Sequence, residues 1–119
     1  MILFKRKFRE AIHTGRKTQT VRLWKRKIAW PGQVRFSPGI GYLKVHEVTP
    51  ISPADLTEAD ARADGFDSLA DLQAELRNLY GNAVEATPDG KRLFRVTFTF
   101  LGEQKPTSSA DAPADNRLG

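Results

Sequence analysis

The sequence contains no cysteine among its 119 residues and only two histidines, His13 and His46. Without thiols, neither a disulfide framework nor a thiolate metal site can form. The histidines fall at the end of a predicted helix and on a predicted strand, and two isolated imidazoles do not make a convincing ligand set. We therefore predict no metal and no other cofactor.

Long hydrophobic runs are also missing. No apolar stretch approaches the roughly 20 residues that span a bilayer. The first residues, MILFKRKF, place their charges after the apolar residues, unlike a secretory signal. These features predict a cytoplasmic protein without a membrane partner, and 119 residues suffice for one domain with a modest core.

Acidic residues are nearly absent from the first 36 residues, which hold eleven Lys and Arg against Glu10 alone, for a net charge of +10. Residues 47–89 hold ten acids against Arg62 and Arg77, for a net charge of −8. Such a dipolar domain presents one strongly positive surface, which favours a polyanionic partner. The alternative is an ordinary solvated face.

Hydrophobic alternation and helical periodicity together predict an α+β fold. The expected strands lie at 2–4, 17–22, 33–36, 42–49 and 93–101, and the expected helices at 7–14, 57–63 and 68–80. About five strands in so short a chain predict a small, mixed or largely antiparallel β-barrel whose openings are covered by two to three helices. We expect the domain to span 1–101, followed by a disordered polar tail over 102–119.

The stretch GRKTQTVR, from Gly15 to Arg22, lies between two basic clusters and is the strongest candidate for a functional element. Strand alternation would put Lys17 and Thr20 on opposite faces, so the two side chains approach each other only if the backbone bends. The alternative is a basic edge strand whose charges are solvated or discourage edge pairing.

Three basic residues follow between two tryptophans, Trp24 and Trp30. Indole faces stack on bases and cations neutralise phosphates, so this composition suits a nucleic-acid groove. The alternative is a loop fixed to the core by its tryptophans. We expect that structural role for Trp30, which precedes Pro31-Gly32, and leave both roles open for Trp24.

One acid in the second half stands out by its position. Asp64 lies just before Gly65-Phe66, where the end of the predicted helix 57–63 could aim its carboxylate back at the sheet. Most other acids of this segment are expected to be ordinary solvated charges.

These residues resemble the activating-signal-cointegrator homology (ASCH) domains over roughly 2–101. The pattern there is a phenylalanine-bearing helix, G-x-K-T-x-T-x-R, a later P-G-x strand start and an A-R-A-E-G-F-like helix end. This chain supplies Phe8, Gly15, Lys17, Thr18, Thr20, Arg22, Pro31-Gly32-Gln33 and Ala61-Arg62-Ala63-Asp64-Gly65-Phe66. The resemblance implies a barrel similar to the pseudouridine-synthase-and-transglycosylase (PUA) RNA-binding domain, with a positively charged cleft beside it.

The function we expect first is therefore nucleic-acid binding, with RNA or a nucleotide-like ligand in a basic cleft around GRKTQTVR. Lysines and arginines would contact phosphates, and Arg22 and Trp24 would lie near bases. The expected contacts are Lys5, Arg6, Lys7, Arg16, Lys17, Arg22, Trp24, Lys25, Arg26 and Lys27.

The alternative implied by the resemblance is an enzyme. One branch of small bacterial members hydrolyses the amide of N-acetylated cytidine with a lysine, a threonine and a glutamate, which match Lys17, Thr20 and Asp64 here. Lysine would act as base, threonine as nucleophile and the carboxyl group as the acid for the departing amine. Asp64 is one methylene shorter than glutamate, which pulls the interpretation back toward binding.

Two weaker alternatives remain. Ribonuclease activity is associated with ASCH domains, but no motif here assigns its residues. A protein-interaction module that uses the acidic helical face rests on charge alone.

Overall fold

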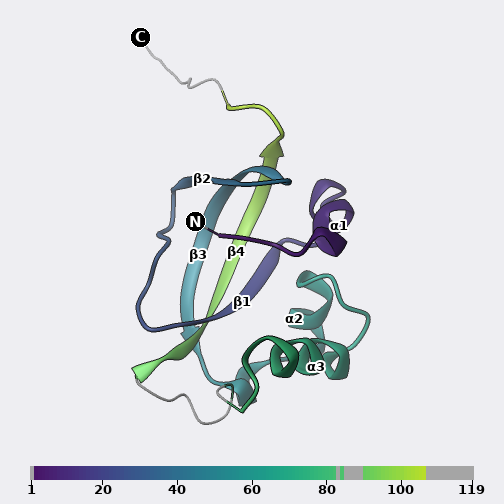
Figure 1. Ribbon diagram of the computed structural model, residues 1–119, viewed down its shortest axis with the longest axis vertical. Coiled ribbons are helices and arrows are strands. Elements are labelled where there is room, and N and C mark those ends of the chain that lie inside the picture. The colour runs from purple at the N-terminus through teal and green to yellow at the C-terminus, as the bar shows by residue number, and fades with distance from the viewer. Residues whose placement is uncertain (1, 83, 85–89, 107–119) are drawn as a thin grey trace.

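The computed structural model describes residues 2–82, 84 and 90–106, and its centre is a curled, fully antiparallel sheet (Figure 1). The four strands are β1 (Gln19–Trp24), β2 (Val34–Ser37), β3 (Gly41–Ile51) and β4 (Arg92–Gly102). Their order across the sheet is β1-β4-β3-β2, so β4, the last strand in sequence, lies between β1 and β3. The predicted α+β class is confirmed, and the sheet forms a half-barrel.

The three predicted helices are present. The first begins as a 3-10 turn, η1 (Arg6–Phe8), and continues as α1 (Arg9–His13); a second 3-10 turn, η2 (Pro53–Asp55), precedes α2 (Glu58–Ala63) and α3 (Leu69–Tyr80). The Thr57 and Ser68 side chains accept hydrogen bonds from backbone N–H groups in the first turns of α2 and α3. Gly15 closes the first helical segment with φ +80°, the left-handed conformation expected there. No helix in the described ranges is long and apolar enough to cross a membrane.

The N-terminal segment differs from the prediction. Residues 2–4 do not form a strand; they cross the open face of the sheet toward α1 (Figure 1). Ile2 is buried there, and Phe4 packs against the apolar clusters on that face. A short apolar run predicts burial but not a hydrogen-bonding partner, which is why a buried crossing segment was mistaken for a fifth strand.

The two faces of the sheet carry separate apolar clusters. Phe94, Val96 and Phe98 of β4 point to the face crossed by the N-terminal segment, as their alternation predicts. Leu93 lies in the other cluster, under α2 and α3. Helices α2 and α3 therefore cover one face, and the N-terminal segment covers the other together with α1, whose Ile12 packs with Phe98.

The tryptophan prediction is wrong for Trp30. Its side chain is 49% exposed, and Ala29, fully buried, anchors the loop instead. The Gly32 N–H also donates to the Val45 carbonyl at 2.8 Å. Trp24 takes the structural role, because its ring packs on Phe94 with centroids 5.7 Å apart.

Candidate functional site

Lys17 lies just before β1, in a short segment held between two helices. Its N–H donates to the Ala11 carbonyl at 2.8 Å, and the Thr18 N–H donates to the Ala63 carbonyl at 2.8 Å. Gly65 has φ +92°, and a Cβ at that position would lie 3.4 Å from the Lys17 side chain. The regular strand starts only at Gln19, so the alternation of side chains between the two faces of β1 does not fix the direction of the Lys17 side chain.

The Lys17 ammonium is enclosed, with the whole residue only 2% exposed. Nζ donates to Asp64 Oδ1 at 2.5 Å, to the Asp64 carbonyl at 2.7 Å and to the Gln19 carbonyl at 2.9 Å. Nζ also lies 4.7 Å from the centroid of the Phe8 ring. All three N–H groups of the charged amine thus have oxygen acceptors.

Burial and pairing act in opposite directions on Lys17 and Asp64. Burial lowers the pKa of Lys17, although the Asp64 carboxylate opposes this shift. Burial also raises the pKa of Asp64, against the attraction of Lys17. Asp64 Oδ2 is buried without a hydrogen-bond partner in the described structure. Burial thus favours the neutral form of each group, and the attraction between the two charges opposes it.

Thr20 contacts Arg22 rather than Lys17. Arg22 Nε donates to Thr20 Oγ1 at 2.8 Å, and Nη2 donates to the Leu3 carbonyl. The guanidinium also lies over the Phe4 ring, 5.0 Å from its centroid. Burial lowers the pKa of Arg22, but a guanidinium stays charged at neutral pH. Because Thr20 Oγ1 accepts this hydrogen bond, its own proton is free to be donated elsewhere.

One pocket is lined by the side chains of Lys17, Thr20, Arg22 and Asp64. We call it the Lys17 pocket, and its cavity volume is about 110 Å³. Its walls come from the N-terminal segment, β1, the end of α2 and α3. Aromatic rings supply much of the apolar surface: Phe4, Phe8, Phe66 and Tyr80. Lys17, Thr20 and Asp64 thus line the same pocket, where Lys17 contacts Asp64 and Thr20 contacts Arg22. Within the described ranges, no three His, Asp or Glu side chains are grouped to hold a metal ion.

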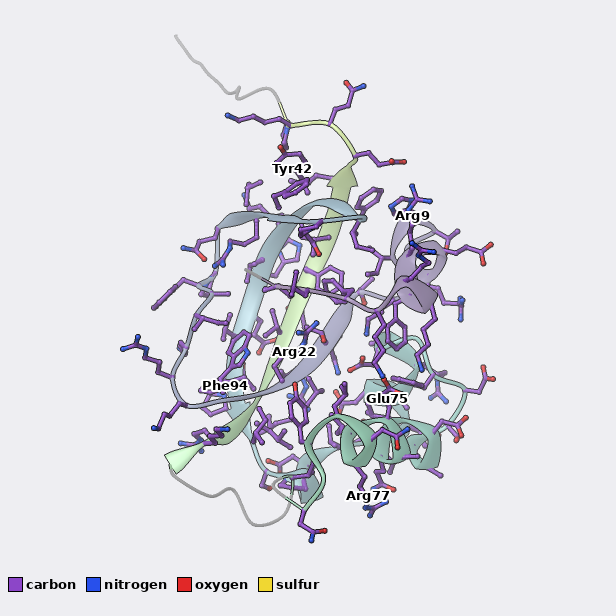
Figure 2. All side chains as sticks on the ribbon, viewed as in Figure 1. Arg9, Arg22, Tyr42, Glu75, Arg77 and Phe94 are labelled. Carbon is purple, nitrogen blue, oxygen red and sulfur yellow. The ribbon has the colours of Figure 1, made fainter. Side chains whose placement is uncertain are left out.

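Glu75 of α3 is a pocket residue that the sequence analysis missed. Its carboxylate pairs with Lys5 at 2.9 Å and with Lys7 at 3.0 Å, which joins the N-terminal segment to α3 (Figure 2). Burial raises the pKa of Glu75, but the hydrogen bonds from the two lysines outweigh it and leave the pKa below its usual range. The sequence carries one sign of this role, because Glu75 lies three residues after Leu72 and so falls on the apolar side of α3, where it is buried.

Asp60 fixes α2 to the sheet. Its carboxylate accepts two hydrogen bonds from Arg95 of β4, at 2.9 and 3.0 Å, and one from Gln19 Nε2 at 3.1 Å. It also accepts the Thr57 N–H at the start of α2. Burial raises the pKa of Asp60, but these hydrogen bonds prevail and lower it. This contact holds the helix whose last turn presents Asp64.

The predicted basic contacts do not all meet in one place. Of the ten residues, Lys5, Lys17 and Arg22 line the Lys17 pocket, and Arg6 lines a second hollow nearby. Arg26 and Lys27 line a third hollow beside Trp30. The other four residues line none of these hollows: Lys7, which is paired with Glu75, Arg16, Trp24 and Lys25. A single cleft that includes all ten residues therefore stays a prediction.

The curled sheet, the crossing N-terminal segment and the pocket between them define an ASCH-type fold. An ASCH domain from Lactobacillus crispatus JV V101 is similar in structure, with a TM-score of 0.62 and 17% identity over 76% of this chain and 67% of that chain. The hypothetical protein PH0355 is similar with a TM-score of 0.67 and 19% identity, over 82% of this chain and 94% of that chain. The protein EF3133 from Enterococcus faecalis V583 is similar with a TM-score of 0.59 and 18% identity, over 80% of this chain and 70% of that chain.

No protein-family model and no curated protein matches the sequence. At these identities the three structures establish the fold alone. The chain thus has the fold of an ASCH domain, and the predicted small α+β architecture is confirmed as a curled antiparallel sheet with helices.

Proposed function

We propose that this domain binds RNA, or a nucleotide-like ligand, in the Lys17 pocket. The observation that carries the proposal is the convergence of Lys17, Thr20, Arg22 and Asp64 on one pocket lined with aromatic rings. Aromatic faces stack on bases, and stacking suits every base because each has a π-face. The basic N-terminal third of the chain supplies the charge that attracts phosphates.

The polar groups of the pocket suit the edge of a base. Asp64 Oδ2 is a buried acceptor without a partner in the described structure, so an exocyclic amino group, as on cytosine, would satisfy it. Thr20 Oγ1 has a proton to donate, and Arg22 lies beside it. Lys17 is too enclosed to reach a phosphate, so in this proposal it holds Asp64 in place.

The test is the binding of a labelled single-stranded oligoribonucleotide of about eight nucleotides, followed by fluorescence anisotropy. We expect the affinity to fall roughly tenfold between about 50 mM and 200 mM salt, because bound phosphates release counterions. Arg22→Gln should weaken binding, whereas Lys44→Gln, which removes an exposed cation of β3 outside the pocket, should leave it nearly unchanged. An affinity that is insensitive to salt and to Arg22→Gln would overturn the proposal.

A second candidate is hydrolysis of N-acetylated cytidine. The observation in its favour is that Lys17, Thr20 and Asp64 line the same pocket, while burial shifts the pKa values of Lys17 and Asp64 toward their neutral forms. The Asp64 carboxylate contacts the Lys17 amine, so the two groups that this candidate requires lie next to each other. Lys17 would first have to release one of its three hydrogen bonds to act as a base.

The steps balance as an acyl transfer followed by hydrolysis. Neutral Lys17 takes the Thr20 hydroxyl proton as Oγ1 attacks the acetyl carbonyl, and the protonated Asp64 gives its proton to the amine as the C–N bond breaks. Water then attacks the acetyl-threonine ester and gives one proton to the Asp64 carboxylate, while the Lys17 ammonium returns its proton to the Thr20 oxygen as the ester bond breaks. Acetic acid leaves, and both groups regain their starting protonation states. Arg22 would stabilise the negative charge that develops beside Thr20.

Chromatography for free cytidine tests this candidate. Thr20→Ala should abolish conversion, whereas Thr18→Ala, an exposed threonine two residues earlier, should retain it. If the unmodified chain converts no N-acetylated cytidine, or if Thr20→Ala remains active, the hydrolase candidate fails and the binding proposal stands alone.

A further inference from the structure

A second hollow lies on the other side of the N-terminal segment from α3. Its volume is about 610 Å³, and its lining consists of Phe4, Arg6, Arg9, Pro38, Gly39 and Ile40. Phe4 also lines the Lys17 pocket, so this one aromatic side chain borders both spaces. We call the second space the Arg9 hollow; Figure 2 shows Arg9 on α1, at the end of the sheet where β2 and β3 meet.

The backbone explains why neighbouring residues serve different spaces. Lys5 has φ −65° and ψ 146°, an extended conformation that turns successive side chains to different sides. Lys5 therefore lines the Lys17 pocket and pairs with Glu75, while Arg6 lines the Arg9 hollow. Residues 4–6 form a ridge with a cation on each side.

The two arginines of the hollow retain donors for an anion. In the described part of the structure Arg6 is exposed, and its side chain makes no hydrogen bond or ion pair; only its backbone carbonyl accepts a hydrogen bond, from the Arg9 N–H. Arg9 donates from Nε to the Gly39 carbonyl at 3.0 Å and from Nη2 to Glu103 at 3.3 Å. A guanidinium has five N–H donors, so Arg9 keeps others for a ligand, and Glu103, with its side chain 62% exposed, is easily displaced.

We propose that the Arg9 hollow binds the phosphate backbone of single-stranded RNA next to the nucleotide whose base enters the Lys17 pocket. This inference rests on the proposed function and adds Arg9, which was not among the predicted contacts. A strand that crosses Phe4 would place its phosphates against Arg6 and Arg9, and a planar guanidinium matches the geometry of a phosphate. The ligand class is thus a nucleotide strand with a phosphodiester on at least one side of the bound base.

The same anisotropy titration tests the hollow with Arg6→Gln, Arg9→Gln, the pocket variant Arg22→Gln and the control Lys44→Gln. Each of the first two changes should weaken binding about fivefold at low salt and reduce the slope of log affinity against log salt by about 0.7. Thermal melting verifies that the variants are folded, because Arg9 also holds the backbone at Gly39.

Removing the negative charge of Glu103, which pairs with Arg9, should have the opposite effect on RNA binding. Glu103→Gln removes an anion that competes for the guanidinium, so its RNA affinity should rise about twofold. This variant keeps the test informative if Arg9→Gln melts early.

The outcomes separate the two proposals. If Arg22→Gln weakens binding while Arg6→Gln and Glu103→Gln both bind like Lys44→Gln, the pocket stands and the Arg9 hollow is wrong. If the unmodified chain binds no RNA, or if Arg22→Gln binds RNA as tightly as the unmodified chain, the proposed function is wrong. The phosphate-binding role of the Arg9 hollow is then wrong as well.

Discussion

Lys17 is the most deeply buried charged residue in the described structure, with 2% of its surface exposed. Its ammonium is held by three oxygens and lies near the rings of Phe4 and Phe8, and Asp64 supplies two of those oxygens. Removing one partner of a buried pair leaves an uncompensated charge, whereas replacing both with apolar groups is often neutral. The pair therefore contributes less to stability than either single variant would suggest, and its position in the pocket gives it a reason to be retained.

This argument predicts a strongly non-additive mutant cycle. Lys17→Met and Asp64→Leu should each lower the free energy of unfolding by about 3 kcal/mol, and the double variant should recover most of that loss. Urea denaturation at neutral pH measures all four proteins. Additive losses in the double variant would show that the two side chains do not form the coupled buried pair described above.

Most of the central residues could be predicted from the sequence, and their partners could not. The resemblance to ASCH domains singled out Lys17, Thr20, Arg22 and Asp64, and all four side chains line one pocket of the structure. Glu75 was overlooked because an acid on a helix is usually solvated, and only the packing of the N-terminal segment on α3 shows that its partners are lysines. Arg9 was overlooked because its hollow is bordered by Gly39, thirty residues away in sequence.

At the scale of the elements, α2 is fixed by a network that starts from its own capping residues. Thr57 and Asp60 form the capping box that the sequence predicts, and the same Asp60 carboxylate reaches Arg95 and Gln19. One side chain thus starts the helix and attaches it to β1 and β4. This attachment sets the position of the last turn, where Asp64 meets Lys17.

The attachment predicts a specific loss of stability in acid. Because the pKa of Asp60 is lowered on folding, the unfolded chain binds its proton first as the pH falls below about 3.9, and the contribution is lost as pH falls through the folded value. Asp60→Asn should lower the free energy of unfolding by about 2 kcal/mol at pH 7. The variant should also lose less stability than the unmodified chain as the pH falls. Denaturant melts between pH 2 and pH 7 measure the effect.

A matched control for this prediction is Asp67→Asn, since Asp67 is exposed in the turn before α3. It should keep the stability of the unmodified chain at pH 7. If Asp60→Asn lost the same amount of stability as this control when the pH falls from 7 to 2, the role given to Asp60 would be contradicted.

The element predictions succeeded where periodicity decides and failed where pairing decides. Helical periodicity predicts the helices at 57–63 and 68–80, and hydrophobic alternation predicts β4; all three are present. The segment 2–4 has the apolar character of a strand, but it is held by side-chain burial and by the contact of Arg22 with the Leu3 carbonyl. Of the expected tail, residues 107–119 lie outside the described residues, so the domain boundary stays a prediction.

At the scale of the whole molecule, the positive charge of the first 36 residues is divided among several surfaces. The N-terminal segment and α1 carry one group of cations next to the Lys17 pocket and the Arg9 hollow, and the loop after β1 carries another beside Trp30. Acidic Glu75 and Glu103 already pair with cations of the first group. Phosphates would therefore compete with these carboxylates for the same cations, which lowers the affinity that the cations can contribute.

The central claim is that the Lys17 pocket, and not the basic loop after β1, receives the ligand. The most direct measurement is a titration of the isotope-labelled chain with a short single-stranded oligoribonucleotide, followed through backbone amide resonances. The account predicts the largest shifts at Lys17, Thr20, Arg22 and Phe66, with smaller ones at Arg6 and Arg9. Shifts concentrated at 25–30, with the amides of the pocket unchanged, would contradict it.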